Sequence, residues 1–265
     1  STLGLFNPNV RKIADLVHAS DALMYYDGAN LNAIVGRCRP GDLGFDIVHL
    51  NLHKTFATPH GGGGPGSGPV GVCDKLTPFM PAPLVTETSG VFKPDFDRPQ
   101  SIGQVAPFYG NFGIILRAYA YILRLGCDGF ADVSETAVLN ANYIRHRLKN
   151  YYDLPYDQVC KHEVVFSAKR QAANGVHALD IAKALIDRGF HPMTIYFPLI
   201  VHEAMMIEPT ETESLETIDE FCDAMIDIAR IAAENPESLK ACPTTMPVGR
   251  LDETRAARQL DIASI

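Results

Sequence analysis

The chain lacks several features that would place it in a specialised class of protein. Its six cysteines are far apart, and no two of them form a Cys-x-x-Cys pair or a metal-ligand spacing. No uninterrupted apolar stretch approaches the roughly 18 to 20 residues that a membrane-spanning helix requires. Lys and Arg form no dense run, and the formal net charge is -8. We therefore expect free thiols in a reducing compartment, no membrane insertion and no nucleic-acid binding.

Three catalytic motifs are also missing. The glycine-rich loop at 61–68 has no Gly-Lys-Ser/Thr after it, which excludes a nucleotide P-loop, and no Gly-x-Ser-x-Gly element of a hydrolase occurs. The histidines at 162, 177, 191 and 202 have no His-Glu-x-x-His spacing, and no Cys-x-x-Cys pair accompanies them. The spacing therefore predicts no metal site.

Apolar periodicity predicts alternating helices and strands in a chain long enough for one large or two modest domains. Helices are expected over 9–18, 112–125, 133–148, 178–188 and 214–233, and strands over 22–26, 47–50, 70–72, 164–166, 194–197 and 204–207. Thr210 and Glu213 have the spacing of a helix capping box. The pattern favours an α/β domain over residues 1–150 and a smaller α+β domain over residues 151–265.

Polar residues follow two of the expected strands, where α/β sheets collect ligands. Asp27 closes one strand, and Lys54 comes shortly after another. Desolvation of a lysine there would lower its pKa and free the amine to form a Schiff base, while a nearby carboxylate could hold a proton on a pyridine nitrogen. Taken singly, an Asp-Gly pair is more often a turn and a lysine more often a solvated surface residue.

The segment Asn51-Leu52-His53-Lys54-Thr55-Phe56, followed by Pro59-His60-Gly61-Gly62-Gly63-Gly64-Pro65-Gly66, resembles the signature of the glycine-decarboxylating P-protein family of the glycine cleavage system. The resemblance extends over essentially the whole chain, including 26–33, 207–214 and 250–253. It implies that Lys54 binds pyridoxal 5'-phosphate covalently, that Asp27 pairs with the pyridine nitrogen, and that Ala29 lies against the cofactor ring.

Other residues near these positions have less certain roles. His53 either tunes the lysine and contacts the cofactor or serves in packing and hydrogen bonding. The loop containing His60, Gly62 and Gly63 could close over a substrate or a partner's arm, or form a plain tight turn. Asn30 and Thr55 complete the set of substrate or loop candidates.

The resemblance also implies a fold and an activity. The fold would be the fold-type I, aspartate-aminotransferase-like fold of pyridoxal-phosphate enzymes, with a partial large domain followed by a small α+β domain. The activity would be decarboxylation of glycine and transfer of the aminomethyl group to the lipoyl arm of H-protein. A complementary P-protein subunit or a homo-oligomer is the expected assembly, in the bacterial or archaeal cytoplasm or, alternatively, the mitochondrial matrix.

The resembling family is longer than this chain, which starts partway through the family's large domain, near Gly4. We expect the aromatic-type residue that stacks on the cofactor and much of the phosphate cradle to lie upstream. Two other functions stay open. One is another pyridoxal reaction, such as transamination or a desulfurase using Cys73, whose apolar context predicts burial. The other is a non-catalytic assembly module of the same complex.

Overall fold

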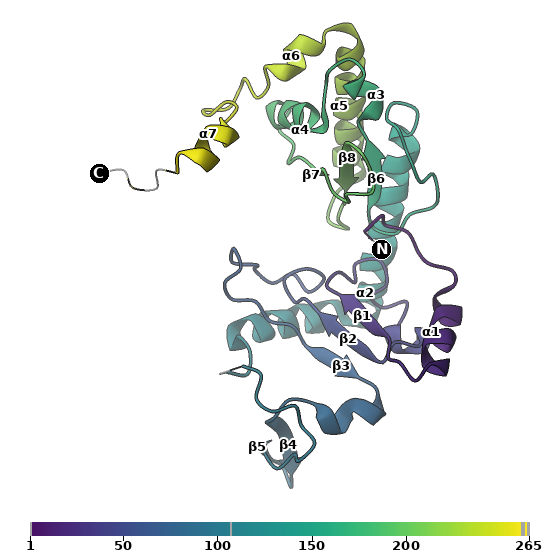
Figure 1. Cartoon of the computed structure of the whole chain (residues 1–265), viewed down its shortest axis with the longest axis vertical. Coiled ribbons are helices and arrows are strands. Elements are labelled where there is room, and N and C mark those ends of the chain that lie inside the picture. The colour runs from purple at the N-terminus through teal and green to yellow at the C-terminus, as the bar shows by residue number, and fades with distance from the viewer. Residues whose placement is uncertain (1, 107, 261–262, 264–265) are drawn as a thin grey trace. The chain divides into compact units, whose positions relative to one another are not determined.

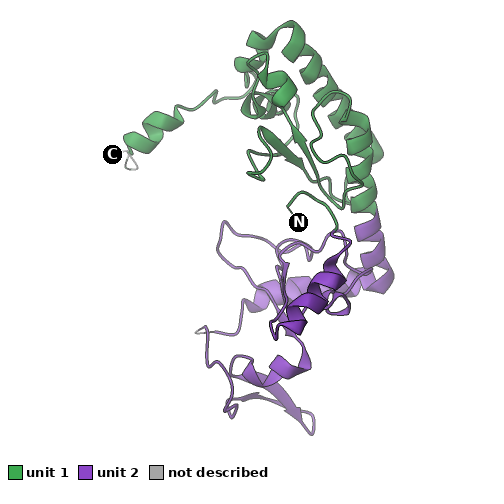
Figure 2. Ribbon diagram, turned by 45° about the vertical axis from the view of Figure 1, so that its right-hand side comes forward, with its two compact units in different colours: residues 1–6, 136–265 green, residues 7–135 purple. Residues whose placement is uncertain are grey.

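A computed structural model describes residues 2–106, 108–260 and 263 of the chain (Figure 1). The chain divides into two compact units (Figure 2): unit 2 is Asn7–Glu135, and unit 1 is Ser1–Phe6 together with Thr136–Ile265. The division falls inside one long helix, α2 (Phe112–Leu148). The sequence predicted a boundary near residue 150 between a large and a small domain. The division into compact units does not test that boundary, which stays a prediction.

Unit 2 contains a sheet in the order β1-β2-β3, in which β1 and β2 are parallel and β3 is antiparallel to β2. Its elements before α2 are α1 (Val10–Ala19), β1 (Tyr25–Gly28), η1 (Pro40–Leu43), β2 (Ile47–Leu50), β3 (Val70–Val72), η2 (Asp74–Phe79), β4 (Leu84–Thr88) and β5 (Val91–Asp95). The strand predicted at 22–26 therefore begins later than expected. The Met24 carbonyl accepts N–H groups of Asp46 and Ile47 just ahead of the ladder.

The antiparallel hairpin of β4 and β5 was not predicted from the sequence. Nearly all of its residues are exposed, so neither strand shows the alternation of buried apolar and exposed polar residues that marks a half-buried strand. The sequence predicted only one strand between β2 and α2, the strand at 70–72.

Helix α2 is bent at Gly126, whose backbone has φ 64° and ψ -170°. A left-handed φ is easy only for glycine, which explains why two helical stretches meet there, as the sequence predicted. The stretch before the bend buries Ile114 and Ala118 against Leu52 and Phe56. No helix of the described residues is long and apolar enough to cross a membrane.

Unit 1 packs helices against an antiparallel sheet in the order β6-β8-β7. Its elements are β6 (Val164–Ser167), α3 (Lys169–Ala172), α4 (Ala178–Asp187), β7 (Thr194–Ile195), β8 (Ala204–Ile207), α5 (Leu215–Glu234), α6 (Pro236–Lys240) and α7 (Glu253–Arg258). One face of α5 is buried at i, i+4 and i+7 through Ile218, Cys222 and Met225, as the apolar spacing predicts.

Two local predictions in unit 1 are wrong. The strand expected at 194–197 ends at Ile195, because Tyr196 has a positive φ of 58° that an extended strand does not permit. Helix α5 is capped by Ser214, whose hydroxyl accepts the Thr217 N–H, rather than by a capping box at Thr210.

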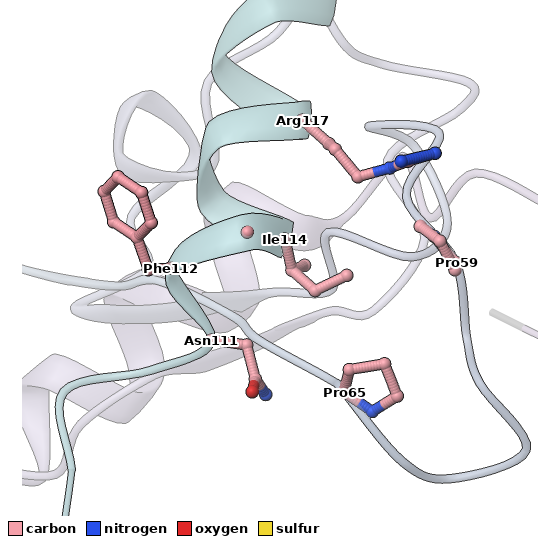
Figure 3. Close-up of a pocket in the computed structure, with 7 residues that line it drawn as sticks. Pro59, Pro65, Asn111, Phe112, Ile114 and Arg117 are labelled. Carbon is pink, nitrogen blue, oxygen red and sulfur yellow. The ribbon is translucent and has the colours of Figure 1, made fainter.

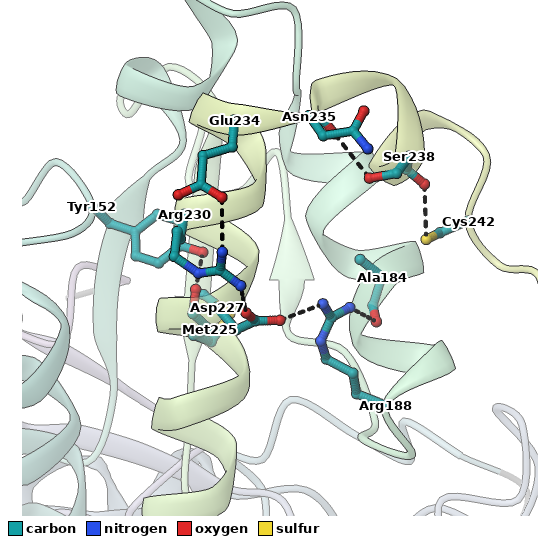
Figure 4. A network of polar contacts seen from close by, with 10 residues as sticks. All are labelled: Tyr152, Ala184, Arg188, Met225, Asp227, Arg230, Glu234, Asn235, Ser238 and Cys242. Carbon is teal, nitrogen blue, oxygen red and sulfur yellow. Dashed lines mark hydrogen bonds and ion pairs between the residues drawn. The ribbon is translucent and has the colours of Figure 1, made fainter.

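Polar contacts tie the helices of unit 1 together (Figure 4). The Arg188 guanidinium at the end of α4 donates to Asp227 on α5 at 2.8 Å, and Arg230 donates to the other oxygen of the same carboxylate at 2.6 Å. The buried Tyr152 hydroxyl donates to the Met225 carbonyl at 2.7 Å. These bonds fix α4 and α5 around a continuous apolar core.

Candidate functional site

The parallel pairing of β1 and β2 gathers the polar segments that follow the two strands. The register sets Asp27 opposite His49 and Gly28 opposite Leu50, so the carboxyl ends of both strands meet at one edge of the sheet. Leu31, just after β1, donates its N–H to Thr55 Oγ1 at 2.8 Å, and this bond is buried. The segments that the sequence identified as chemically important are therefore held together by a direct hydrogen bond.

Asp27 lies in a short chain of polar groups on neighbouring strands. Its Oδ1 accepts the Ala29 N–H at 2.9 Å and lies 3.3 Å from Nε2 of His49. The other ring nitrogen of His49, Nδ1, is 2.6 Å from the Tyr25 hydroxyl. An ionised carboxylate only accepts, so the favourable tautomer carries its hydrogen on Nε2 and accepts from Tyr25 at Nδ1.

The sequence did not identify Tyr25 and His49 as members of the site. A signal existed, because Tyr25 and Asp27 alternate onto one face of a strand and His49 is the cross-strand neighbour of Asp27. Using that signal required the strand register, which residue spacing alone did not provide. The Asp27 side chain keeps 74% of its surface exposed, so its carboxylate is open to a ligand.

Lys54 lies in a turn just beyond β2 and is exposed, while its neighbours Thr55 and Phe56 are buried. The expected desolvation of the lysine amine is therefore not seen in this chain. The reason is local: Phe56 packs into the cluster beside α2 and Thr55 bonds to Leu31, which directs Lys54 away from the apolar cluster.

Two histidines flank the lysine turn. The rings of His53 and His60 meet edge to face, with centroids 4.7 Å apart. Burial lowers the pKa of His53, and its buried Nδ1 has no hydrogen-bond partner among the residues that the structure describes. His60 is exposed, and its Nδ1 accepts the Gly63 N–H at 3.2 Å. His53 thus presents a neutral ring with one unused nitrogen, while His60 fixes the start of the glycine-rich loop.

The loop itself has a conformation that demands glycine. Gly62 and Gly63 have φ values of 62° and 87°, and the Gly64 N–H closes a turn on the Gly61 carbonyl at 3.0 Å. Asn30, in contrast, uses its Oδ1 to accept the Asn32 N–H at 2.9 Å, which is a local turn bond.

Both ends of the glycine-rich loop border a pocket of about 420 Å³ (Figure 3). Pro59 and Pro65 line it from the loop, and Asn111 and Arg117 line it from the start of α2. The Asn111 amide donates to the Gly66 carbonyl at 2.6 Å, which ties the loop to the helix. Arg117 is exposed and brings a positive charge to the pocket wall. The sequence pointed to the loop but not to Asn111, which directly precedes α2, or to Arg117 on α2.

The comparisons with known proteins identify the relatives of this chain. Residues 133–242 match the family described as glycine dehydrogenase, C-terminal domain. A protein of Shouchella clausii named probable glycine dehydrogenase (decarboxylating) subunit 2 is 62% identical over 98% of this chain and 53% of its own length. A protein of Bacillus velezensis with the same name is 60% identical over the same shares. The chain therefore spans about half the length of these curated relatives.

Solved structures show the fold. The crystal structure of an inhibitor-bound glycine decarboxylase (P-protein) of the glycine cleavage system matches 82% of this chain and 51% of its own, with a TM-score of 0.67 and 20% identity. Cysteine desulfurase from Thermococcus onnurineus covers 83% of this chain and 56% of its own, with a TM-score of 0.60 and 15% identity. Serine palmitoyltransferase of Sphingomonas wittichii covers 88% and 53%, with a TM-score of 0.61 and 12% identity. The predicted fold-type I class is thereby confirmed. The resemblance read from the motifs agrees with the roughly 60% identity to the relatives named above.

Proposed function

Because this chain is a homologue of subunit 2 of glycine dehydrogenase (decarboxylating) over nearly its whole length, we propose that it carries the lysine of a pyridoxal-phosphate-dependent glycine decarboxylase. The proposed reaction removes the carboxylate of glycine as CO2 and passes the aminomethyl group to the lipoyl arm of H-protein. The observation that carries the proposal is the roughly 60% identity to relatives of that name.

The residues at the edge of β1 and β2 fit pyridoxal 5'-phosphate chemically. Asp27 offers an open carboxylate, and its Oδ1 is already engaged by Ala29 and His49. A carboxylate in that state can keep a proton on a pyridine nitrogen through a charge-assisted hydrogen bond. Ala29 leaves room for a flat ring, and Lys54 supplies an accessible primary amine for the aldehyde. We propose that these three residues hold the cofactor.

The chain's own residues then have distinct tasks. The cofactor, when bound, supplies an electron sink for the carbanion that decarboxylation leaves behind. Asp27 would hold a proton on the pyridine nitrogen through a charge-assisted hydrogen bond, which would keep the bound ring electron-poor. His49 holds the Asp27 carboxylate in place, and Tyr25 holds the His49 tautomer. The Lys54 amine, once released from the cofactor, is a base or acid that can move a proton.

Thr55, His60, Gly62 and Gly63 have supporting roles in the proposal. Thr55 is a positioning residue, because its hydroxyl joins the two strand-end segments. His60 and the two glycines set the shape of the loop that borders the pocket. We propose that substrate or the partner's arm approaches through this loop, and that Asn30 keeps its local turn role.

A desulfurase function has no support from Cys73. Its thiol lies 3.5 Å from Oδ1 of Asp46, a carboxylate that also accepts from Met24 and His18. The thiol is thus engaged as a hydrogen-bond donor to a carboxylate that already bridges other groups. Bacterial relatives favour the bacterial cytoplasm as the location, and assembly with a complementary subunit or a second copy completes the proposal.

Cofactor labelling tests the proposal. The purified chain is incubated with pyridoxal 5'-phosphate, reduced with borohydride and mapped by mass spectrometry. We expect a pyridoxyl group on Lys54, no such label in Lys54→Ala, and an unchanged label in Lys12→Ala, which removes an exposed lysine of the same unit. Asp27→Asn should weaken the cofactor's affinity because the paired charge is lost.

The same variants belong in the longer protein, where glycine decarboxylation can be measured. Lys54→Ala should lower the rate by roughly 10³-fold or more. Failure of the longer, folded protein to label at Lys54 would show the enzymatic proposal to be wrong. A chain that binds H-protein or a complementary subunit without ever taking the cofactor would instead be the assembly module.

A further inference from the structure

Three side chains with metal-binding groups meet at one end of the sheet in unit 1. The β6–β8 ladder pairs Val164 with Ile207, so Glu163 and Glu208 form the next opposing pair beyond it. His162 directly precedes Glu163 in the sequence. Its Nε2 lies 3.5 Å from Glu208 Oε1 and 3.9 Å from Glu163 Oε2. All three donor atoms lie within 4.8 Å of one another.

His162 has bonding capacity that the described residues do not use. Its side chain is only 6% exposed, yet neither ring nitrogen makes a hydrogen bond. Buried polar atoms are nearly always bonded, so two unused nitrogens at one buried ring call for a ligand. Burial also lowers the pKa of His162 to about 4, which leaves the imidazole neutral at pH 7 with a lone pair to offer.

The two carboxylates point to the charge of that ligand. Like charges directly opposite each other on antiparallel strands are destabilising. The Glu163 side chain is only 10% exposed, so these two acidic groups and the imidazole meet where little water reaches them. A divalent cation could bind both carboxylates and the imidazole at once. One imidazole with two carboxylates is a ligand set that suits Zn²⁺ and similar transition metals.

We propose that His162, Glu163 and Glu208 bind one divalent transition-metal ion, for which Zn²⁺ is the probe, with water completing its coordination. Bonds of about 2.0–2.2 Å in a tetrahedral shell place the donors roughly 3.3–3.6 Å apart. The distances of 3.5 and 3.9 Å from His162 therefore need only a small adjustment of side chains. The site shares no residue with the proposed cofactor site.

The site also contacts the beginning of the chain. The Lys161 N–H donates to the Gly4 carbonyl at 2.6 Å, and a Cβ at Gly4 would lie 2.1 Å from the Glu163 carbonyl oxygen. The segment at Gly4 is therefore packed directly against the residues that lead into β6, which include His162 and Glu163. An ion bound here would stabilise unit 1 where that segment joins the sheet.

Calorimetric titration with Zn²⁺ tests the site in chain that has been stripped with a chelator and had its thiols alkylated. We expect one ion per chain, and at least a tenfold loss of affinity in His162→Gln and Glu163→Gln. Glu208→Gln should lose affinity to the same degree while folding normally, because its side chain is 33% exposed. His191→Gln, which removes an exposed histidine of the same unit, should bind as the parent chain does.

Thermal unfolding gives a second readout. Zn²⁺ should raise the unfolding midpoint of the parent chain and of His191→Gln, but not that of Glu208→Gln. The proposal is overturned if the folded parent chain binds no stoichiometric Zn²⁺, or if Glu208→Gln binds as tightly as the parent. It is equally overturned if binding disappears when residues are added ahead of Ser1, since the site must hold in a longer chain.

Discussion

The two units differ in how completely they bury their own apolar side chains. Unit 1 has a large continuous core in which residues of α2, α4, α5 and the β6–β8 ladder are almost fully buried. In unit 2 the corresponding cluster is small, and it consists of Leu52, Phe56, Ile114 and Ala118. Helix α2 meanwhile exposes apolar side chains before its bend: Phe112, Ile115, Leu116, Tyr119, Ile122 and Leu123.

This contrast separates a unit with a continuous apolar core of its own from a unit that leaves an apolar helix face exposed. The exposed residues of α2 recur at i, i+3, i+4 and i+7, which is the spacing of a face that packs against something. The proposed cofactor residues Asp27 and Lys54 belong to the same unit and are also exposed. The proposed cofactor residues and the large apolar core therefore lie in different units of this chain.

The largest expected effect on the unfolding free energy comes from removing a buried core side chain. Phe166→Ala removes a fully buried ring of β6 and should cost about 3–5 kcal/mol of unfolding free energy. Phe112→Ala, which removes a ring that is 77% exposed, should change it by less than about 0.5 kcal/mol. Urea unfolding followed by far-ultraviolet circular dichroism measures both. Equal costs for the two substitutions would contradict the contrast between the units.

Thiol reactivity should differ by a factor of roughly 100 or more. Cys127 of unit 2 is exposed, whereas burial raises the pKa of Cys160 to about 11 and that of Cys222 to about 12. Because the thiolate is the reactive form, iodoacetamide at pH 8 should modify Cys127 first and leave the other two intact until unit 1 unfolds. Mass spectrometry of timed samples gives the rates. Early labelling of Cys222 would mean that unit 1 opens readily.

Glu163 should make unit 1 sensitive to pH. Its carboxyl is protonated in both states below pH 4.5. Between pH 4.5 and 7 the unfolded chain loses the proton and the folded chain keeps it, so stability falls as pH rises. Glu163→Gln should therefore gain about 1–3 kcal/mol relative to the parent between pH 4.5 and 7.5.

Urea unfolding at several pH values, in chelator, measures that gain. His162, whose pKa is lowered to about 4, acts in the opposite direction as pH falls below 6.5. It is present in both proteins, so comparing them at each pH removes most of its contribution. A constant difference between Glu163→Gln and the parent across this range would rule out the raised pKa.

The smallest expected difference concerns surface ion pairs. Asp227→Asn breaks the two-arginine network of α4 and α5 and should cost about 1 kcal/mol in unit 1. In unit 2, Glu135→Gln breaks a single exposed pair with Arg37 and should cost about 0–0.5 kcal/mol. Thermal unfolding at low and high salt would compare them. A larger cost for Glu135→Gln than for Asp227→Asn would contradict this order. It would mean that the exposed Arg37–Glu135 pair stabilises unit 2 more than the Asp227 network stabilises unit 1.

Strong local patterns made parts of the fold predictable. Strand β2 matches its predicted range because Ile47–Leu50 is a short apolar run with clear boundaries, and α5 follows its apolar spacing closely. The start of β1 was missed because the apolar Ala22–Met24 run suggested an earlier beginning than the strand pairing allows. The cap of α5 was missed because the Thr210–Glu213 spacing competed with another local signal, Ser214, whose hydroxyl accepts the Thr217 N–H. The exposed hairpin gave no burial pattern to detect.

The candidate site shows the same limit. Motif resemblance singled out Asp27 and Lys54, whereas the contacts of His49 with Tyr25 and Asp27 depend on the pairing of two strands. Glu208 joins His162 only because β6 and β8 pair, although the two residues are distant in sequence. Residue spacing predicts local structure. It does not predict which side chains are brought together when distant strands pair in a sheet.

The turn of the glycine-rich loop has a consequence for chirality. At Gly62 the backbone has φ 62°, and a Cβ placed there would meet no atom within 4 Å. Handedness rather than lack of space disfavours an L-side chain at that position. In a semisynthetic chain, D-alanine at position 62 should therefore preserve the turn that L-alanine strains. The backbone at this position has the left-handed conformation that D-amino acids prefer.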